Sequence, residues 1–180
     1  MAKLADIDNK AAEKGSFLVT VWQFVKFIVV SLLAMIVQFV LLNTLQLIPA
    51  IKELYNSGDF TWWIFSYSAA VGGMGYFIVS NVANIVAQIV AFFVNKEKTF
   101  NSGANVAVAL PIYIVFTIAL IAFSAWLNPT LKDVFMGFEW CNETAAKNIA
   151  TMICSALQFF LYFPVDKLLF HKKKEEKKEA

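Results

Sequence analysis

Long apolar runs alternate with short charged segments along this chain. Charged residues are absent from four intervals, which run from Lys26 to Lys52, Asp59 to Lys96, Lys98 to Lys132 and Lys147 to Asp166. Each interval can hold the ~20 apolar residues that a helix needs to cross a bilayer. The pattern predicts an all-α membrane protein with four transmembrane helices, over about 22–46, 74–95, 105–126 and 145–166.

The remaining segments are predicted to lie outside the hydrocarbon layer. Residues 1–18 form a polar N-terminal lead, 19–170 the four-helix transmembrane domain, and 171–180 a charged tail. Segments 48–72 and 127–143 combine aromatic residues with few charges, which is typical of loops at the membrane interface. Because the lead is polar and the first apolar run is too long for a cleavable signal peptide, the first helix itself is expected to direct insertion.

The lysines are distributed unevenly between the two sets of loops. Twelve of the 15 basic residues lie in the N-terminal lead and first helix entry, the 96–104 loop or the C-terminal region, and three lie in the opposite loops. This asymmetry predicts that both termini are cytoplasmic. Helices one and two, and helices three and four, then form two tandem helical hairpins with the same orientation.

Amide and hydroxyl side chains form stripes on two of the predicted helices. At about 100° per residue, the polar residues of the second helix fall within about 60°, and those of the fourth within about 80°. These residues are Asn81, Asn84, Gln88 and Asn95 on the second helix, and Asn148, Thr151, Ser155, Gln158, Tyr162 and Asp166 on the fourth. An amide facing lipid would cost several kcal/mol, so both stripes are expected to face inward.

Two interpretations of the stripes remain open. Each side chain could join helices through hydrogen bonds of ~0.6–2 kcal/mol, and the small residues Ala83, Ala87 and Ala91 favour such close packing. As a set, however, the stripes indicate a path for a neutral, hydroxyl-rich group such as a sugar. The residues of this candidate sugar path are Gln38, Asn81, Asn84, Gln88, Ser155, Gln158 and Tyr162.

Ionisable groups are scarce within the predicted spans. Only Asp166 approaches the membrane, near its inner face, which argues against a proton-driven exporter of small molecules. The one histidine, His171, is in the tail, and Cys141 and Cys154 are too few for a disulfide framework or a metal site. We therefore expect no enzyme, catalytic residue, metal, cofactor or nucleic-acid partner.

A phosphate group would have to be bound without arginine, because every basic residue is a lysine. Four lysines from three helix ends are expected to surround one cytoplasmic entrance, and amide, hydroxyl and carboxyl groups lie beside them. This candidate lipid-phosphate site consists of Lys26, Asn95, Lys96, Lys98, Thr99, Asp166 and Lys167. Lys26 could equally extend to the headgroups without a specific ligand, and the tail lysines are expected to contact anionic phospholipids.

Three segments resemble motifs of the GtrA-like family of small four-helix membrane proteins, and the resemblance covers about residues 22–170. KFIVVSLLAMIVQFVLL (26–42) begins with the family's basic residue and Phe, although Gln38 stands where an Asp is common. SNVANIVAQIVAFFVNKEKTF (80–100) matches at Phe92, Asn95, Lys96, Thr99 and Phe100. QFFLYFPVDKLLF (158–170) matches at Pro164, Asp166, Lys167 and Phe170.

The resemblance implies a function in the bacterial cytoplasmic membrane. Members of this family are thought to move a polyprenyl-phosphate-linked sugar to the outer leaflet, where membrane glycosyltransferases use it for surface polysaccharide or teichoic acid glycosylation. The alternative is a scaffold that does not transport, which positions a glycosyltransferase or presents lipid to it. The small internal volume of a four-helix unit leaves homo-oligomerisation open.

Overall fold

The computed structural model describes residues 2–171, without the side chains of residues 2–5, 143, 144, 147 and 148. The tail segment 172–180 and the side chain of the stripe residue Asn148 lie outside the described residues. The elements are α1 (Ala2–Glu13), α2 (Ser16–Leu45), α3 (Pro49–Tyr55), β1 (Phe60–Trp62), β2 (Phe65–Tyr67), the 3₁₀ turn η1 (Ala69–Val71), α4 (Gly73–Val94), the π-helical turn η2 (Asn95–Thr99), α5 (Val106–Met136) and α6 (Glu143–Leu169).

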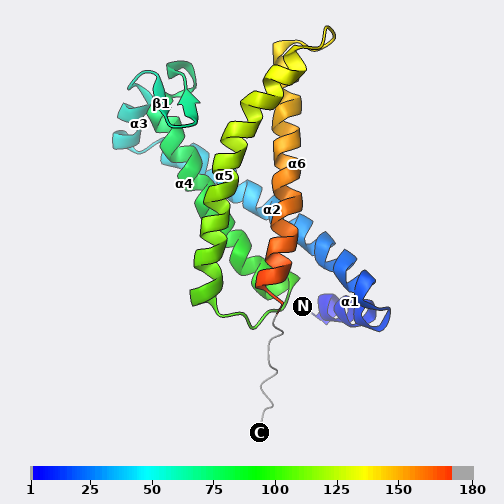
Figure 1. Ribbon diagram of the computed structural model, residues 1–180. Coiled ribbons are helices and arrows are strands. Elements are labelled where there is room, and N and C mark those ends of the chain that lie inside the picture. The colour runs from blue at the N-terminus through cyan, green and yellow to red at the C-terminus, as the bar shows by residue number, and fades with distance from the viewer. Residues whose placement is uncertain (1, 172–180) are drawn as a thin grey trace.

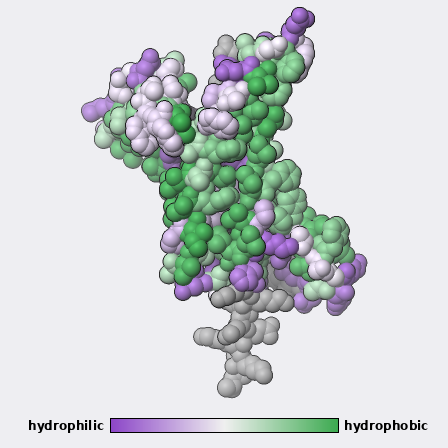
Figure 2. All heavy atoms as spheres, viewed as in Figure 1, coloured by the Kyte–Doolittle hydropathy of each residue, from purple (hydrophilic) through white to green (hydrophobic). Residues whose placement is uncertain are grey.

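Four helices are long and apolar enough to cross a membrane. They are α2, α4 continued through η2, α5, and the Ile149–Leu169 part of α6, with 30, 27, 31 and 21 residues. At ~1.5 Å per residue even the shortest reaches about 30 Å, the thickness of the hydrocarbon layer. On the face shown in Figure 2, hydrophobic residues cover the middle of the molecule and hydrophilic residues collect at both ends. The predicted multi-pass membrane protein with four spanning helices is confirmed in length and composition.

The long helices pack as two neighbouring pairs, α2 with α4 and α5 with α6 (Figure 1). In the first pair, Ala87 and Ala91 of α4 are buried against Val30 and Ala34 of α2, since small side chains let the helices approach closely. A second cluster connects all four helices through aromatic rings, including Phe27, Phe92, Tyr113, Tyr162 and Phe170. We call the end of the molecule with the start of α2, η2 and the end of α6 the η2 end (Figure 1).

The opposite end carries the folded segment between α2 and α4. Strands β1 and β2 pair antiparallel, with Phe60 opposite Tyr67, and their rings pack around Phe77 at the start of α4. Helix α3 lies directly on α4, and the contact needs a glycine at position 75. A Cβ there would come within 2.6 Å of the Tyr55 nitrogen. The predicted interfacial loop 48–72 is therefore a compact unit and includes a strand pair, which the all-α prediction did not contain.

Several predicted boundaries were wrong. The N-terminal lead contains the helix α1, and α2 begins at Ser16 rather than near residue 22. Helix α5 continues to Met136, through Pro129, although its predicted end was near residue 126 and 127–143 was expected to be a loop. Proline has no N–H to donate to the carbonyl four residues earlier, that of Ala125, yet α5 continues through Pro129.

The close α2–α4 contact gives a stability prediction. Replacing Ala87 with Leu forces extra volume between the two helices and should destabilise the protein by about 1–3 kcal/mol. The neighbouring Val86→Leu change, at an exposed position of α4, should alter stability little. Equilibrium unfolding in mixed detergent micelles measures both values, and equal stability of the two variants would contradict the proposed packing.

Candidate functional site

A groove of about 340 Å³ lies between α2, α4, α5 and α6. This volume is in the lower part of the range of small-molecule sites, about 300–1,000 Å³. We call it the interhelical groove, and its lining residues are Phe27, Ile28, Ser31, Leu32, Ala34, Met35, Gln38, Gln88, Ala91, Asn95, Tyr113, Ser155, Gln158, Phe159 and Tyr162.

The lining of the groove combines polar and apolar side chains. Amide and hydroxyl groups reach it from all four long helices, and none of its lining residues is charged. Three apolar lining residues of α2, Ile28, Leu32 and Met35, are exposed on the surface of the protein, with 38%, 52% and 59% of their area accessible. Because this surface belongs to a membrane-spanning segment, the groove opens sideways toward lipid.

Helical spacing and aromatic packing explain where the groove begins. Ser31 and Gln38 are seven residues apart, which places them on the same side of α2. Nearer the η2 end, phenylalanines hold α2 against α6, with ring centroids 5.0 Å apart for Phe24 and Phe163 and 5.1 Å for Phe27 and Phe159. Beyond these rings the two helices no longer pack closely, and the groove lies between them.

Several stripe residues form hydrogen bonds between helices. The Tyr113 hydroxyl on α5 donates to the Gln88 side-chain oxygen on α4 at 2.9 Å, and the Tyr162 hydroxyl on α6 donates to Thr117 Oγ1 on α5 at 3.1 Å. Gln158 on α6 donates to Ser124 on α5. These bonds support the first interpretation of the stripes, in which polar side chains join helices.

Gln38 and Ser155 differ from the other polar residues of the groove. Within the described residues 2–171, neither side chain has a hydrogen-bond partner, and both line the groove from opposite helices. An unpaired amide or hydroxyl in an apolar medium is costly. Gln38 is half-buried and Ser155 is exposed, so both groups can bond to water or to a polar ligand in the groove.

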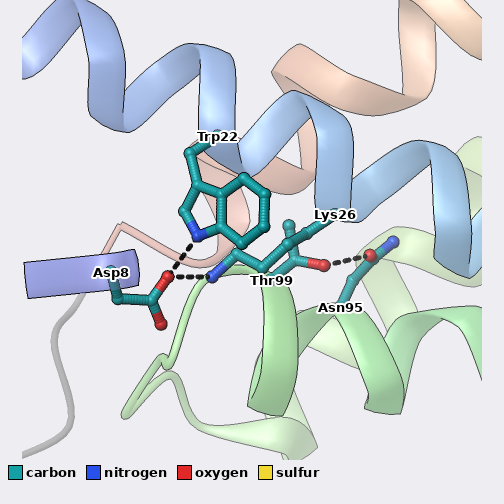
Figure 3. Close-up of polar contacts among 5 residues, drawn as sticks. All are labelled: Asp8, Trp22, Lys26, Asn95 and Thr99. Atoms are coloured by element: carbon teal, nitrogen blue, oxygen red, sulfur yellow. Dashed lines mark hydrogen bonds and ion pairs between the residues drawn. The ribbon is translucent and has the colours of Figure 1, made fainter. Parts of the chain in front are cut away.

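A buried cluster of three polar side chains closes the groove at the η2 end. Asn95 donates through Nδ2 to Asp166 Oδ2 at 2.7 Å, and the Thr99 hydroxyl donates to Asn95 Oδ1 at 2.8 Å (Figure 3 shows the second bond). Asp166 is fully buried, and its second oxygen, Oδ1, has no partner among the described residues. The cluster connects α6 to η2, so these residues, predicted as phosphate ligands, hold helices together here.

The four lysines of the candidate phosphate site lie at the η2 end but do not line the groove. Lys26 pairs with Asp8 at 2.9 Å, and Lys167 donates to Thr20 Oγ1 at 2.7 Å. Lys96 lies 3.4 Å from the Glu97 carboxylate, whereas Lys98 is exposed. On α2, Lys26 faces a different side from Ser31 and Gln38, as its position in the sequence predicts.

Only some of the residues of the predicted sugar path lie together in the structure. Gln38, Gln88, Ser155, Gln158 and Tyr162 line the groove. The path residues Asn81 and Asn84 lie farther along α4 and do not line it; Asn81 donates to the carbonyl of Phe77 in its own helix at 2.7 Å. The lining residues Ser31 and Tyr113 were missed, although both belong to polar positions with helical spacing.

No model of a known protein family, no curated protein and no solved structure matches this chain. The resemblance to the GtrA-like family therefore stays a prediction from motifs, and the function is argued from the geometry of the site.

The buried cluster at Asp166 gives a second stability prediction. Asn95→Leu leaves the buried carboxyl group without its partner and should lower the free energy of unfolding by about 1–3 kcal/mol. Asn84→Leu is the matched control, since the half-buried Asn84 side chain has no hydrogen-bond partner among the described residues. Detergent unfolding equilibria measure both changes. If Asn95→Leu is as stable as the wild type, the cluster does not join α6 to η2.

Proposed function

We propose that this protein carries a polyprenyl-phosphate-linked monosaccharide across the bacterial cytoplasmic membrane, for the glycosylation of surface polysaccharide or teichoic acid. In this proposal both termini are cytoplasmic, and the four spans form two tandem hairpins. The observation that carries the proposal is the interhelical groove, whose uncharged lining carries amide and hydroxyl groups among apolar side chains and opens sideways to lipid between α2 and α6.

The groove suits the two uncharged parts of this lipid, the sugar and the long apolar prenyl chain. Sugar hydroxyls both donate and accept hydrogen bonds, so they can satisfy the unpaired Gln38 and Ser155 side chains. The prenyl chain stays in the bilayer, beyond the exposed rim of Ile28, Leu32 and Met35. Hydrogen bonds from the groove replace those from water, which lowers the cost of bringing the sugar into the hydrocarbon layer.

The position of the groove suits loading from the cytoplasmic leaflet. Its lining on α2 runs from Phe27 to Gln38, roughly 16 Å at ~1.5 Å per residue, about half of the hydrocarbon thickness. This half adjoins the η2 end, where the candidate phosphate-site lysines lie. Since those lysines do not line the groove, their proposed function is to attract the lipid phosphate to this end of the protein. Net movement is then driven by consumption of the sugar in the outer leaflet.

Transfer between leaflets tests this function directly. Purified protein in liposomes should accelerate the exchange of a labelled polyprenyl-phosphate sugar between leaflets, and Gln38→Leu should reduce that rate at least tenfold, about the effect of 1.4 kcal/mol on a barrier. Gln46→Leu makes the same chemical change at the C-cap of α2, outside the groove, and should keep the wild-type rate. Without acceleration by the wild-type protein, carriage is not its own activity, and a lipid-presenting subunit of a glycosyltransferase becomes the better hypothesis.

The proposed orientation has its own test. Single cysteines at Ser57 and Lys98, introduced after replacement of Cys141 and Cys154, place one thiol at each end of the molecule. A membrane-impermeant maleimide added to intact cells should label position 57 and spare position 98 until the membrane is permeabilised. The opposite labelling pattern would show that the protein has the reverse orientation, with the groove nearer the outer leaflet.

A further inference from the structure

A second hollow lies between α1 and the first turns of α2. It is a shallow, open hollow of about 280 Å³ and shares no lining residue with the interhelical groove. We call it the α1–α2 crevice, and its lining residues are Ile7, Lys10, Ala11, Lys14, Leu18, Val21, Trp22 and Val25. The crevice is therefore apolar along its length and has two lysines on the α1 side.

Beside this crevice, the carboxylate of Asp8 accepts hydrogen bonds from two donors on α2, one of them cationic. Asp8 Oδ1 on α1 accepts hydrogen bonds from the Trp22 indole N–H and from Lys26 Nζ, the latter at 2.9 Å (Figure 3). Trp22 and Lys26 are four residues apart on α2, so both donors point to one position. The Lys26 side chain is only 14% exposed, and its ammonium group also lies 5.9 Å from the centroid of the Trp22 ring.

This geometry is that of an anion site. Two donors converge on one oxygen, and a charge-assisted bond to an ammonium group is among the stronger hydrogen bonds in proteins. A phosphate group presents oxygen acceptors of the same kind, and Lys10 and Lys14 supply further positive charge close by. The Asp8 carboxylate lies in the position from which such a phosphate would accept hydrogen bonds from Trp22 and Lys26.

We propose that the α1–α2 crevice binds an anionic membrane phospholipid, whose phosphate displaces Asp8 from Trp22 and Lys26. One acyl chain then lies along Leu18, Val21 and Val25, and the phosphate meets the donor pair at the edge of the crevice. This site is distinct from the interhelical groove and does not depend on sugar carriage. It concerns which lipid the N-terminal helix recognises.

Three observations favour a phospholipid as the occupant. The lining is apolar where α2 enters the membrane, and Leu18, Val21 and Val25 are each about 40% exposed there. The two charged residues that line the crevice, Lys10 and Lys14, are basic and match an anion, and lysines near a membrane surface are attracted to anionic lipids. The anion position also adjoins the crevice, since Trp22 both lines the crevice and donates to Asp8.

Competition between the phosphate and Asp8 predicts how the lipid affinity changes in each variant, which apolar binding alone does not. While Asp8 holds the donor pair, only the fraction of molecules with free donors can accept a phosphate, which weakens the apparent affinity. Removing the carboxylate should therefore tighten lipid binding. Removing either donor should weaken it.

The indole N–H signal of Trp22 reports on this site directly. In ¹⁵N-labelled full-length protein in detergent micelles, the signal is assigned with Trp22→Phe and followed during titration with dihexanoyl-phosphatidylglycerol. We expect a saturable shift whose midpoint falls about five- to tenfold in Asp8→Ala, an ordinary size for coupling between two ligands. Lys26→Gln should remove the saturable shift.

Matched controls separate the site from general charge effects. Asp6→Ala removes an exposed carboxylate from the same helix, and Lys52→Gln removes a lysine at the opposite end; neither should move the midpoint. Zwitterionic dihexanoyl-phosphatidylcholine and inorganic phosphate alone should leave the signal in place. An equal response to either probe, or a midpoint in Asp8→Ala that is unchanged or raised, overturns the proposal. The readout is equilibrium binding, so its failure is distinguishable from a failure of sugar carriage.

Discussion

The need to pair polar groups inside an apolar layer governs this structure. Hydrocarbon offers no water to an amide or hydroxyl, so a polar side chain in a spanning helix needs a partner within the protein. Some bond a carbonyl of their own helix, and others connect α4, η2, α5 and α6 through the pairs Gln88–Tyr113, Asn95–Asp166, Thr117–Tyr162 and Ser124–Gln158. Within the span, α2 contacts its neighbours instead through small residues and phenylalanine rings. The groove lies along the one long helix that these polar bonds do not reach.

The sequence alone predicts the spans, because the length of an apolar run is a direct measure of what can cross a bilayer. It also predicts the side of each helix that faces inward, and five residues of the predicted sugar path do line the groove. The sequence could not show at which level along the helices the groove lies. Asn81 and Asn84 share the direction of Gln88, but α2 and α6 do not form the groove at their level, and a helical wheel contains no information on where a neighbouring helix diverges.

Chemical roles were harder to predict than positions. Asn95, Thr99 and Asp166 stay predicted phosphate ligands, and the structure adds that each is buried and hydrogen-bonded within the cluster at η2. Residue type shows that a side chain is polar, whereas its partner depends on packing between segments 71 positions apart in sequence. The same limit hid the contact of Asp8 with Lys26, because the N-terminal lead gave no sign that it folds back on α2.

The absence of charge among the lining residues of the groove matters for carriage as we propose it. A sugar phosphodiester must take its negative charge through the middle of the membrane, where an unsolvated ion is very costly. A lysine at that depth would bind the phosphate strongly, but a carrier needs binding that is favourable enough to admit the ligand and weak enough to release it. Amide donors such as those of Gln38 and Gln158 offer hydrogen bonds without a full charge. With the four lysines of the candidate phosphate site at the η2 end and outside the groove, the proposed electrostatic attraction acts on arrival, and the groove itself would hold the headgroup through exchangeable hydrogen bonds.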